Sequence, residues 1–363
     1  MTRFAKTIFF VSLSALLLSM PSVSAQTFVE ASDLTLVGNL FLDTPHPYHR
    51  LDTAKYKGFE KKDITVIIQS SGLAVAFKTN SRNISVQTEY GYRRFGNFSS
   101  GIALRGYDLY IKKDGKWLFA TAGVVPEEQV DQPFVLMPNL DGSVHECLLY
   151  LPLYSEELSV KIGVDEGSFI EPLENPFRHR VGIFGSSFTH GGGATRSGMT
   201  YPAIFTRDTG IQLLSLGVSG RSKLQPAFAR ALADADVEAY IFDAFSNPSL
   251  NQVRENLFPF IETIQAKKPG IPLIFQRTIY RESRNFNTVK RKFEEDRQAL
   301  ADSLMDIACK KYKDVYYIKC TDAASPEHDT SVEGTHPSDY GYFIWARSIE
   351  KPILKILRKY GIK

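Results

Sequence analysis

Two adjacent serines stand in a glycine-rich stretch near the middle of the chain. The segment VGIFGSSFTHGGG covers residues 181–193 and places Ser186 and Ser187 directly after an apolar run. A phosphate-binding loop would need a lysine after its last glycine, and a dinucleotide fingerprint would need the spacing G-x-G-x-x-G. The segment has neither. A serine at the end of a strand is typical of a turn or helix cap and, when a base lies nearby, of a nucleophile.

A histidine near the C-terminus has the neighbours that such a nucleophile requires. His336 lies in SVEGTHPSDYGY, residues 331–342, three residues after Glu333. A serine hydroxyl attacks a carbonyl when a base accepts its proton, and imidazole does so near neutral pH when a carboxylate fixes its tautomer. Of the seven histidines, His336 is the one with this context. For His190, inside the serine segment, a place in the pocket wall and a catalytic role are both open.

These two segments resemble the conserved blocks of the SGNH (GDSL-type) hydrolases. The sequence GSSFT, residues 185–189, is similar to their first block and aligns Ser187 with the family nucleophile and Ser186 with a variable position. The sequence SLGVSGRSK, residues 215–223, is similar to the second block, with Gly220 as the glycine whose N–H enters the oxyanion hole. The resemblance implies ester hydrolysis through an acyl-enzyme on Ser187.

The third block of this family supplies an asparagine to the oxyanion hole. Asn247 in FDAFSNPS, residues 242–249, is the best match, although the usual Gly-x-Asn-Asp wording is absent and Asn251 is a second candidate. The resemblance therefore implies an oxyanion hole made of the Ser187 and Gly220 N–H groups and the Asn247 amide. The implied mechanism uses no metal and no organic cofactor.

The last block departs from the family pattern at one position. The family has D-x-x-H, whereas EGTH, residues 333–336, carries Glu333 in place of the aspartate. The additional methylene still allows the carboxylate to reach the imidazole of His336. The third member of the triad is therefore assigned to Glu333, with Asp329 and Asp339 as the nearby alternatives.

The resemblance extends into the first half of the chain. The sequence RGYDLYIKKDGKW, residues 105–117, looks like the G-x-D-L-Y signature of a β-domain that precedes one branch of SGNH esterases, and GGGATRSGMTYP, residues 191–202, is similar to the same branch. We interpret Tyr107 and Asp108 as residues that organise this β-domain and its contact with the catalytic domain.

The elements that must position the candidate residues follow from the hydrophobic pattern. Apolar strand-like runs at 181–184, 212–216, 240–242, 272–275 and 315–318 alternate with helical patterns at 224–235, 250–267, 288–311 and 339–359. Such alternation predicts a mostly parallel sheet covered on both faces. The resemblance to the SGNH hydrolases implies that this sheet belongs to a flavodoxin-like α/β/α fold. Ligands of these folds bind at the carboxyl ends of the strands, where Ser187 and Asn247 stand.

The first half of the chain has a different hydrophobic pattern. Short apolar or alternating segments at 63–69, 72–78, 83–89, 107–113 and 116–121 are punctuated by Gly, Asn, Asp or Ser. They predict an antiparallel β-sandwich resembling a jelly roll, with no convincing helix. The segment EPLENPFRHR, residues 171–180, marks the boundary, so we expect a β-domain at 26–172 and a hydrolase domain at 176–363.

The first 25 residues read as a secretory signal peptide. An apolar run of fourteen residues, 7–20, follows Arg3 and Lys6 and ends before Val23-Ser24-Ala25, where cleavage is expected. The run is short for a membrane span and no second one follows. The mature protein is predicted to be secreted or periplasmic.

Charge and cysteine content restrict the possible partners. The formal net charge of +3 falls to +1 once the signal is removed, which argues against a nucleic-acid or acidic-membrane partner. The three cysteines, Cys147, Cys309 and Cys320, are too few for a disulfide scaffold and have no zinc-site spacing. A Cys309–Cys320 bridge and buried free thiols are equally open.

We expect a short-chain ester as the substrate, most specifically an acetyl ester on a carbohydrate. Export, the β-sandwich, near-neutral charge and the lack of a long apolar lid favour it over a lipid. Arg196 and Arg221 flank the expected pocket and are either substrate ligands or ordinary surface arginines. Two alternatives stay open: a general short-chain carboxylesterase or lipolytic enzyme, and a carbohydrate-binding protein with a decayed hydrolase site.

Overall fold

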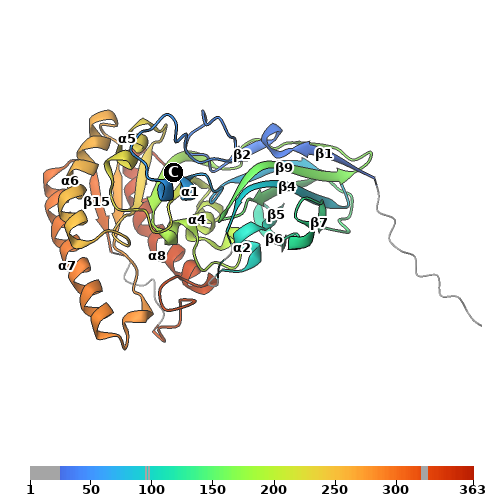
Figure 1. Cartoon of the computed structure of the whole chain (residues 1–363). Helices are drawn as coiled ribbons and strands as arrows, with labels where there is room; N and C mark the ends of the chain where they lie inside the picture. The colour runs from blue at the N-terminus through green and yellow to red at the C-terminus, as the bar shows by residue number, and fades with distance from the viewer. Residues whose placement is uncertain (1–24, 95, 97–98, 320–325) are drawn as a thin grey trace, which may run out of the picture.

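The computed structural model describes residues 25–94, 96, 99–319 and 326–363. A β-sandwich part and an α/β part lie end to end, with the chain passing from the first to the second near residue 175 (Figure 1). Residues 1–24 of the expected signal peptide lie outside the described residues, and so does Cys320, on which the open question of a Cys309–Cys320 bridge depends. Of the described cysteines, Cys147 is buried and Cys309 is exposed.

The first part is built on an antiparallel β-sandwich. In the described residues, one sheet has four strands in the order β1-β9-β4-β7, and the other has six, with β10-β3-β8-β5-β6 in a row and β2 paired to β3. The strand bounds are β1 Gln26–Glu30, β2 Thr35–Val37, β3 Ala74–Thr79, β4 Ile84–Arg93, β5 Tyr107–Lys113, β6 Lys116–Gly123, β7 Phe134–Met137, β8 His145–Tyr150, β9 Ser155–Asp165 and β10 Ile170–Pro172. The predicted sandwich is confirmed.

The α/β part is built on a parallel sheet. Its strand order is β12-β11-β13-β14-β15, and all the pairs are parallel. The strands are β11 Arg178–Gly185, β12 Ile211–Gly217, β13 Ala239–Asp243, β14 Leu273–Gln276 and β15 Val315–Ile318. The helices are α3 Ser187–His190, α4 Tyr201–Thr209, α5 Pro226–Asp234, α6 Leu250–Lys267, α7 Thr288–Lys311 and α8 Asp339–Leu357. The predicted α/β fold is thus also confirmed.

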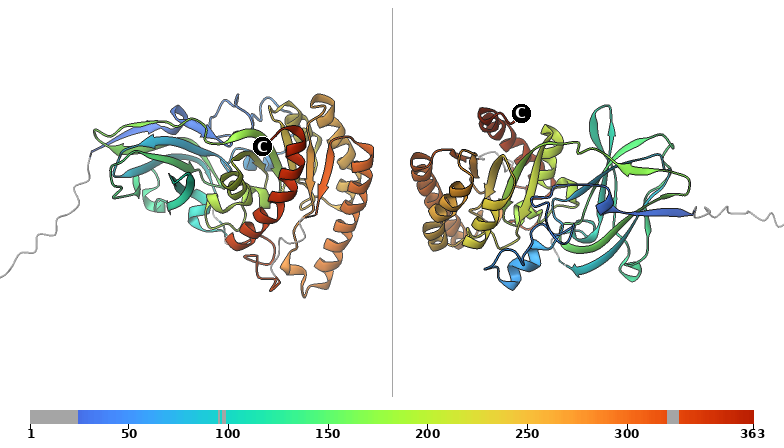
Figure 2. Two further views of the ribbon diagram at one scale, coloured as in Figure 1. Left: turned by 180° about the vertical axis from the view of Figure 1, so that it is seen from behind. Right: turned by 90° about the horizontal axis from the view of Figure 1, so that it is seen from above.

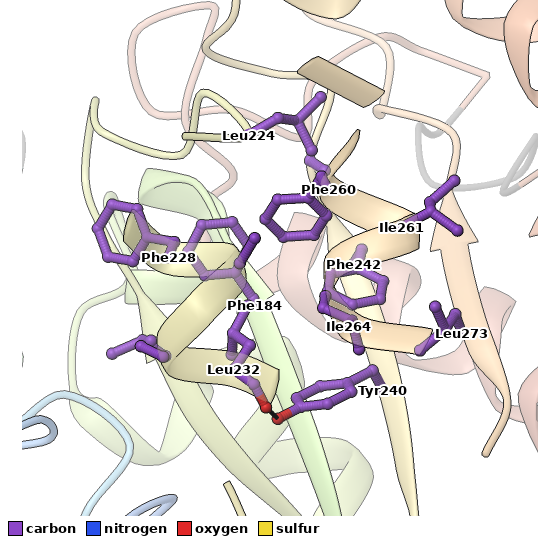
Figure 3. Close-up of a cluster of buried hydrophobic side chains, with 14 of the residues drawn as sticks. Phe184, Leu224, Phe228, Leu232, Tyr240, Phe242, Phe260, Ile261, Ile264 and Leu273 are labelled. Carbon is purple, nitrogen blue, oxygen red and sulfur yellow. Dashed lines mark hydrogen bonds between the residues drawn. The ribbon is translucent and has the colours of Figure 1, made fainter. Parts of the chain in front are cut away.

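The helices cover the parallel sheet on both faces (Figure 2). On one face, Phe184 and Phe242 of the central strands pack against Phe228 of α5 and Phe260 of α6, as Figure 3 shows. On the other face, Ile183 and its neighbours pack against α4 and α8. Burial of this apolar surface on both faces fixes the strands rigidly and therefore the loops at their carboxyl ends.

One segment that we read as a strand is a helix. Residues 63–69 begin inside α1, Lys61–Ile67, which opens with a capping box between Glu60 and Asp63. Val66 and Ile67 are buried in the core of the parallel sheet and not in the sandwich. The apolar residues of this short segment thus line one face of a helix, and the expectation of an all-β first half without a helix is wrong; α2, Gly101–Arg105, is a second departure.

Candidate active site

Ser187 begins the short helix α3 at the carboxyl end of the central strand β11. Gly185 ends this strand, and a Cβ there would stand 2.0 Å from Thr189 Oγ1 and 2.8 Å from Asp243 Cβ. No other residue fits so close to the neighbouring chain. The chain therefore turns sharply into α3 and leaves the Ser187 side chain at the edge of the sheet, where it is 8% exposed.

The two serines of this turn have different surroundings. Ser186 is fully buried and is the N-cap of α3, with its Oγ accepting a hydrogen bond of 3.1 Å from the Phe188 N–H. The same Oγ donates to Asp243 Oδ2 at 2.6 Å. Ser186 is thus occupied by structural contacts, whereas Ser187 faces His336.

A continuous hydrogen-bonded chain links Ser187, His336 and Glu333. The distance from Ser187 Oγ to His336 Nε2 is 2.9 Å, and His336 Nδ1 is hydrogen-bonded to Glu333 Oε1. The same carboxylate oxygen accepts the His336 backbone N–H at 2.9 Å. This arrangement places Nε2 where it can accept the proton of Ser187, which is the requirement for a serine nucleophile.

The loop that carries Glu333 and His336 is folded back on itself. Val332 N–H donates to His336 O at 2.8 Å, a bridge pairs Ser331 with Pro337, and Gly334 has a φ of +84°. This closed loop brings the longer glutamate side chain onto the ring. The alternative Asp339 accepts instead from the Thr195 N–H at 2.8 Å.

A buried carboxylate that sequence reasoning missed connects two of the catalytic loops. Asp243 ends β13, and its Oδ2 accepts from the Ser186 N–H at 3.0 Å and from Thr189 Oγ1 at 3.2 Å. Its Oδ1 accepts from Ser246 Oγ at 3.1 Å, next to Asn247. Burial raises the pKa of Asp243, and these hydrogen bonds oppose the rise. Its place directly after the strand predicted at 240–242, in FDAFSNPS, was the available signal.

The two other candidate oxyanion donors follow the strands on either side of β11. Gly220 lies in an exposed turn after β12 with a φ of +73°, and a Cβ there would meet nothing within 4 Å. Asn247 follows β13; among the described residues no partner is found for its buried Oδ1. Because β12, β11 and β13 are neighbours, their carboxyl ends bring the loops of Gly220, Ser187 and Asn247 to one edge of the sheet.

His190 supports this edge and is turned away from Ser187. It is fully buried, its Nε2 lies 2.6 Å from Leu153 O, and its Nδ1 accepts from the Ser219 N–H at 3.4 Å. Burial, reinforced by the charge of Arg50, holds the pKa of His190 well below its usual value. A neutral imidazole with one fixed tautomer therefore braces the turn that contains Gly220.

Neither of the arginines expected near the pocket is available as a simple substrate ligand. Arg196 Nη1 donates to both carboxylate oxygens of Asp108, at 2.9 and 2.8 Å, and Asp108 also accepts from the Gly198 N–H at 2.8 Å. Arg221 pairs with Asp63 of α1 and with Glu60. The aspartate of the GYDLY segment thus joins the sandwich to the loop after α3, as we interpreted it.

Metal-ligand clusters and membrane-spanning helices were also sought. Among the described residues, no three or more His, Cys, Asp or Glu side chains gather where a metal ion could bind. Within the same residues, each helix is too short or too polar to cross a membrane.

The fold and the site together define a class: an α/β/α protein with a Ser–His–carboxylate chain at the carboxyl edge of its sheet and a β-sandwich before it. Residues 178–355 match the model of the GDSL-like lipase/acylhydrolase family, and residues 26–170 match that of the GxDLY N-terminus of SGNH-type esterases. A solved structure assigned as a GDSL-like lipase from Bacteroides ovatus is 37% identical over 92% of this chain and 98% of that chain, with a TM-score of 0.88. The chain belongs to the GDSL-like lipase/acylhydrolase family of SGNH-type esterases.

More distant structures share the fold. A salicylyl-acyltransferase from a tetracycline biosynthetic pathway is 21% identical over 92% of this chain and 98% of that chain, with a TM-score of 0.70. A family two carbohydrate esterase from Clostridium thermocellum, solved with cellohexaose, is 13% identical over 81% of this chain and 94% of that chain, with a TM-score of 0.56. None of the curated protein sequences matches this chain.

Proposed function

We propose that the protein is an exported serine esterase that hydrolyses short-chain esters, chiefly acetyl esters carried by carbohydrates. The observation that carries the proposal is the hydrogen-bonded chain from Glu333 through His336 to Ser187 Oγ. It has the order and contacts that activate a serine hydroxyl.

In this mechanism Ser187 Oγ attacks the ester carbonyl and His336 Nε2 accepts its proton. The proton then passes to the leaving alcohol, and an acyl group stays on Ser187. A water molecule attacks the acyl-enzyme, again with His336 as base, and the acid is released. Glu333 keeps the ring in its tautomer and stabilises the imidazolium.

The negative charge of the tetrahedral intermediate needs donors. We assign them to the backbone N–H groups of Ser187 and Gly220 and to the side-chain amide of Asn247. The support is their common position at the carboxyl edge of three neighbouring strands. Loss of one such donor typically costs about 3 kcal/mol of transition-state stabilisation.

The carbohydrate substrate and export are the more specific parts of the proposal. The fold also serves carbohydrate esterases, including one bound to cellohexaose, so it is compatible with a glycan substrate. The apolar run at residues 7–20 and the small residues before Gln26 support export. The division into domains at 26–172 and 176–363 is part of the same proposal.

Hydrolysis of p-nitrophenyl esters of increasing acyl length tests the reaction class. We expect kcat/KM for the acetyl ester to exceed that for the octanoyl ester by about tenfold, because the sequence has no sign of a long apolar acyl tunnel. A preference for octanoyl esters would support the lipolytic alternative. Absence of hydrolysis with every ester would support a binding protein with a decayed site.

A further inference from the structure

A polar cleft lies beside the candidate active site. It has a volume of about 350 Å³ and is formed between α7 and the loop after β14. This volume is in the range of small-molecule binding sites. The residues used below are Arg277, Tyr280 and Arg284 from the loop, and Glu295, Gln298 and Asp302 from α7. None of them belongs to the Ser187–His336–Glu333 chain.

The cleft continues the line of catalytic loops along the sheet. Ser187 follows β11, Asn247 follows the neighbouring strand β13, and Arg277 follows β14, the next strand in the sheet. Thr278, which lines the cleft, is hydrogen-bonded through Oγ1 to Ser246 Oγ at 2.7 Å. Ser187 and the cleft therefore lie at the same edge of the sheet, on the two sides of the loop that carries Asn247.

The wall between the cleft and the site is held by hydrogen bonds and ion pairs. Arg281 and Arg297 both donate to Ser246 O, at 3.1 and 2.8 Å. Both arginines also bind the carboxylate of Glu294, which lines the cleft. The Arg281 guanidinium lies over the ring of Phe188, 5.1 Å from its centroid, directly after Ser187. One buried network thus supports the nucleophile helix, the Asn247 loop and the cleft wall.

The charges of the cleft favour a neutral, hydroxyl-rich ligand. Arg277 pairs with Asp302 at 2.8 Å, and Arg284 lies 3.7 Å from Glu295, so charges of both signs alternate along the walls. An anionic ligand would meet the carboxylates, and an alkyl chain would desolvate all of these groups without replacing their hydrogen bonds. Hydroxyl groups can both donate and accept, which matches this mixed set.

The aromatic side chain in the cleft indicates how such a ligand is held. The Tyr280 ring already has the Arg284 guanidinium 4.5 Å and the His328 ring 4.7 Å from its centroid. We therefore expect the contacts to be hydrogen bonds and not ring stacking. Arg277 would donate to the ligand, and the Gln298 side-chain oxygen and the Glu295 carboxylate would accept from it, because the Gln298 nitrogen already donates to Asp302 and Tyr317.

We propose that this cleft binds neutral sugar residues of the glycan that carries the ester. The inference rests on the proposed function and adds to it a place for the glycan chain, on the β14 side of Ser187. A monosaccharide ester positioned for attack by Ser187 would leave the cleft empty, whereas a longer glycan would fill it.

Chain-length dependence of acetate release tests the cleft. The substrates are acetylated monosaccharides and acetylated tetrasaccharides of three series, built from glucose (cello-), xylose (xylo-) or mannose (manno-) units. Their kcat/KM values are measured beside that of p-nitrophenyl acetate. We expect kcat/KM to rise about tenfold from mono- to tetrasaccharide in at least one series. Ala299→Trp, which places an indole in the cleft from an exposed position of α7, should remove this rise and leave p-nitrophenyl acetate hydrolysis within about twofold. Gln298→Ala should lower only the tetrasaccharide value, about fivefold.

Lys310→Trp, at an exposed position near the C-terminal end of α7, is the matched control and should behave as the unaltered protein. Two results would show that the cleft does not bind the glycan, while the esterase proposal stands. In the first, p-nitrophenyl acetate is hydrolysed but kcat/KM does not rise with chain length in any series. In the second, kcat/KM still rises with chain length in Ala299→Trp. If Ala299→Trp lowers both activities equally, it acts through the fold and the inference is wrong. If no ester is hydrolysed, the proposed function fails and the inference fails with it.

Discussion

The two serines of one turn differ in what they can do, although the sequence places them side by side. Ser187→Ala should lower p-nitrophenyl acetate hydrolysis by several orders of magnitude, because it removes the hydroxyl that is hydrogen-bonded to His336 Nε2. Ser186→Ala removes a helix cap and one donor to Asp243, which costs about 1 kcal/mol of stability but leaves the nucleophile. We expect it to retain substantial activity, because the protein stays folded and Ser187 is unchanged.

Mass spectrometry of the protein after fluorophosphonate treatment gives an independent readout. The adduct should lie on Ser187 in the unaltered protein and in Ser186→Ala, and Ser187→Ala should not react. An adduct on Ser186 would show that Ser186, and not Ser187, is the reactive serine of this turn, and that the assignment is wrong.

Glu333 is the residue of the site that departs from the family pattern, and variants of Glu333 and His336 should lower activity to different extents. His336→Ala should abolish activity. Glu333→Gln keeps the size of the side chain but removes the charge that stabilises the imidazolium, so we expect a loss of about 10²-fold to 10⁴-fold in kcat. Glu333→Asp shortens the side chain by one methylene, about 1.5 Å, in a closed loop where the glutamate already contacts both Nδ1 and the backbone N–H of His336. It should also lose activity.

The measurement is kcat and KM for p-nitrophenyl acetate across the pH range, with KM expected to change little. Full activity of Glu333→Gln would mean that the site works as a Ser–His dyad or with another carboxylate. Full activity of Glu333→Asp would show that the loop adapts to either length.

The residues with chemical signatures could be predicted from the sequence, and their supports could not. Ser187 and His336 stand in short segments whose types and spacing indicate their chemistry. Asp243 and His190 act through contacts with residues far apart in the chain, such as Asp243 with Ser186 and His190 with Leu153 O. No local pattern contains such contacts, because they arise when strands β11, β12 and β13 come together.

At the scale of elements, the long periodic helices and the buried strands were predictable. The expected helices at 250–267 and 288–311 coincide with α6 and α7 because their apolar residues recur over many turns. The helix α1 spans only seven residues, which is too short for a helical repeat of apolar residues to be recognised. The buried residues that it packs against belong mostly to the other half of the chain. The cap at its start, Glu60 with Asp63, does not have the usual Ser/Thr-x-x-Glu/Gln form and gave no sequence signal.

One strand carries a titratable group that should make stability depend on pH. Glu157 of β9 is fully buried, and burial raises its pKa to about 8, although the Ser155 hydroxyl donates to its carboxylate. The folded state thus favours the protonated form. The stability that Glu157 contributes is complete below the unfolded pKa, about 4.5, and is lost as the pH rises towards 8.

Glu157→Gln replaces the neutral carboxyl with a neutral amide of the same shape. We expect this variant to gain a few kcal/mol over the unaltered protein at pH 8.5 and to match it near pH 5. Urea unfolding at several pH values measures the difference. An identical slope of stability against pH in both proteins would show that Glu157 is ionised in the fold.

At the scale of the whole molecule, the two parts share their interior. Residues Leu40, Leu51 and Tyr56 from the first half pack in the same core as Phe184 and Phe242 of the parallel sheet. The Arg50 side chain is fully buried, and its Nη1 donates to Gly217 O at 2.7 Å, at the end of β12. A Cβ on Gly72 would stand 2.4 Å from Ser215 Cβ, so the backbones approach closely. The first half is therefore part of the support of the catalytic loops.

Removal of the first half tests this interdependence. A chain beginning at Pro176 would lose α1, the segment that contains Leu40 and Tyr56, and the Asp108 partner of Arg196. It would expose the apolar face that these residues cover, and we expect it to be insoluble or to unfold well below the Tm of a chain beginning at Gln26. Asp108→Asn in the full chain is a milder version. It keeps the side chain's shape but removes the carboxylate charge that pairs with the guanidinium of Arg196. It should lower Tm by several degrees and leave the reactivity of Ser187 unchanged. If the shortened chain is soluble, folds with the Tm of the longer one and hydrolyses p-nitrophenyl acetate equally well, the shared core contributes nothing that the parallel sheet needs, and the sandwich is an independent attachment.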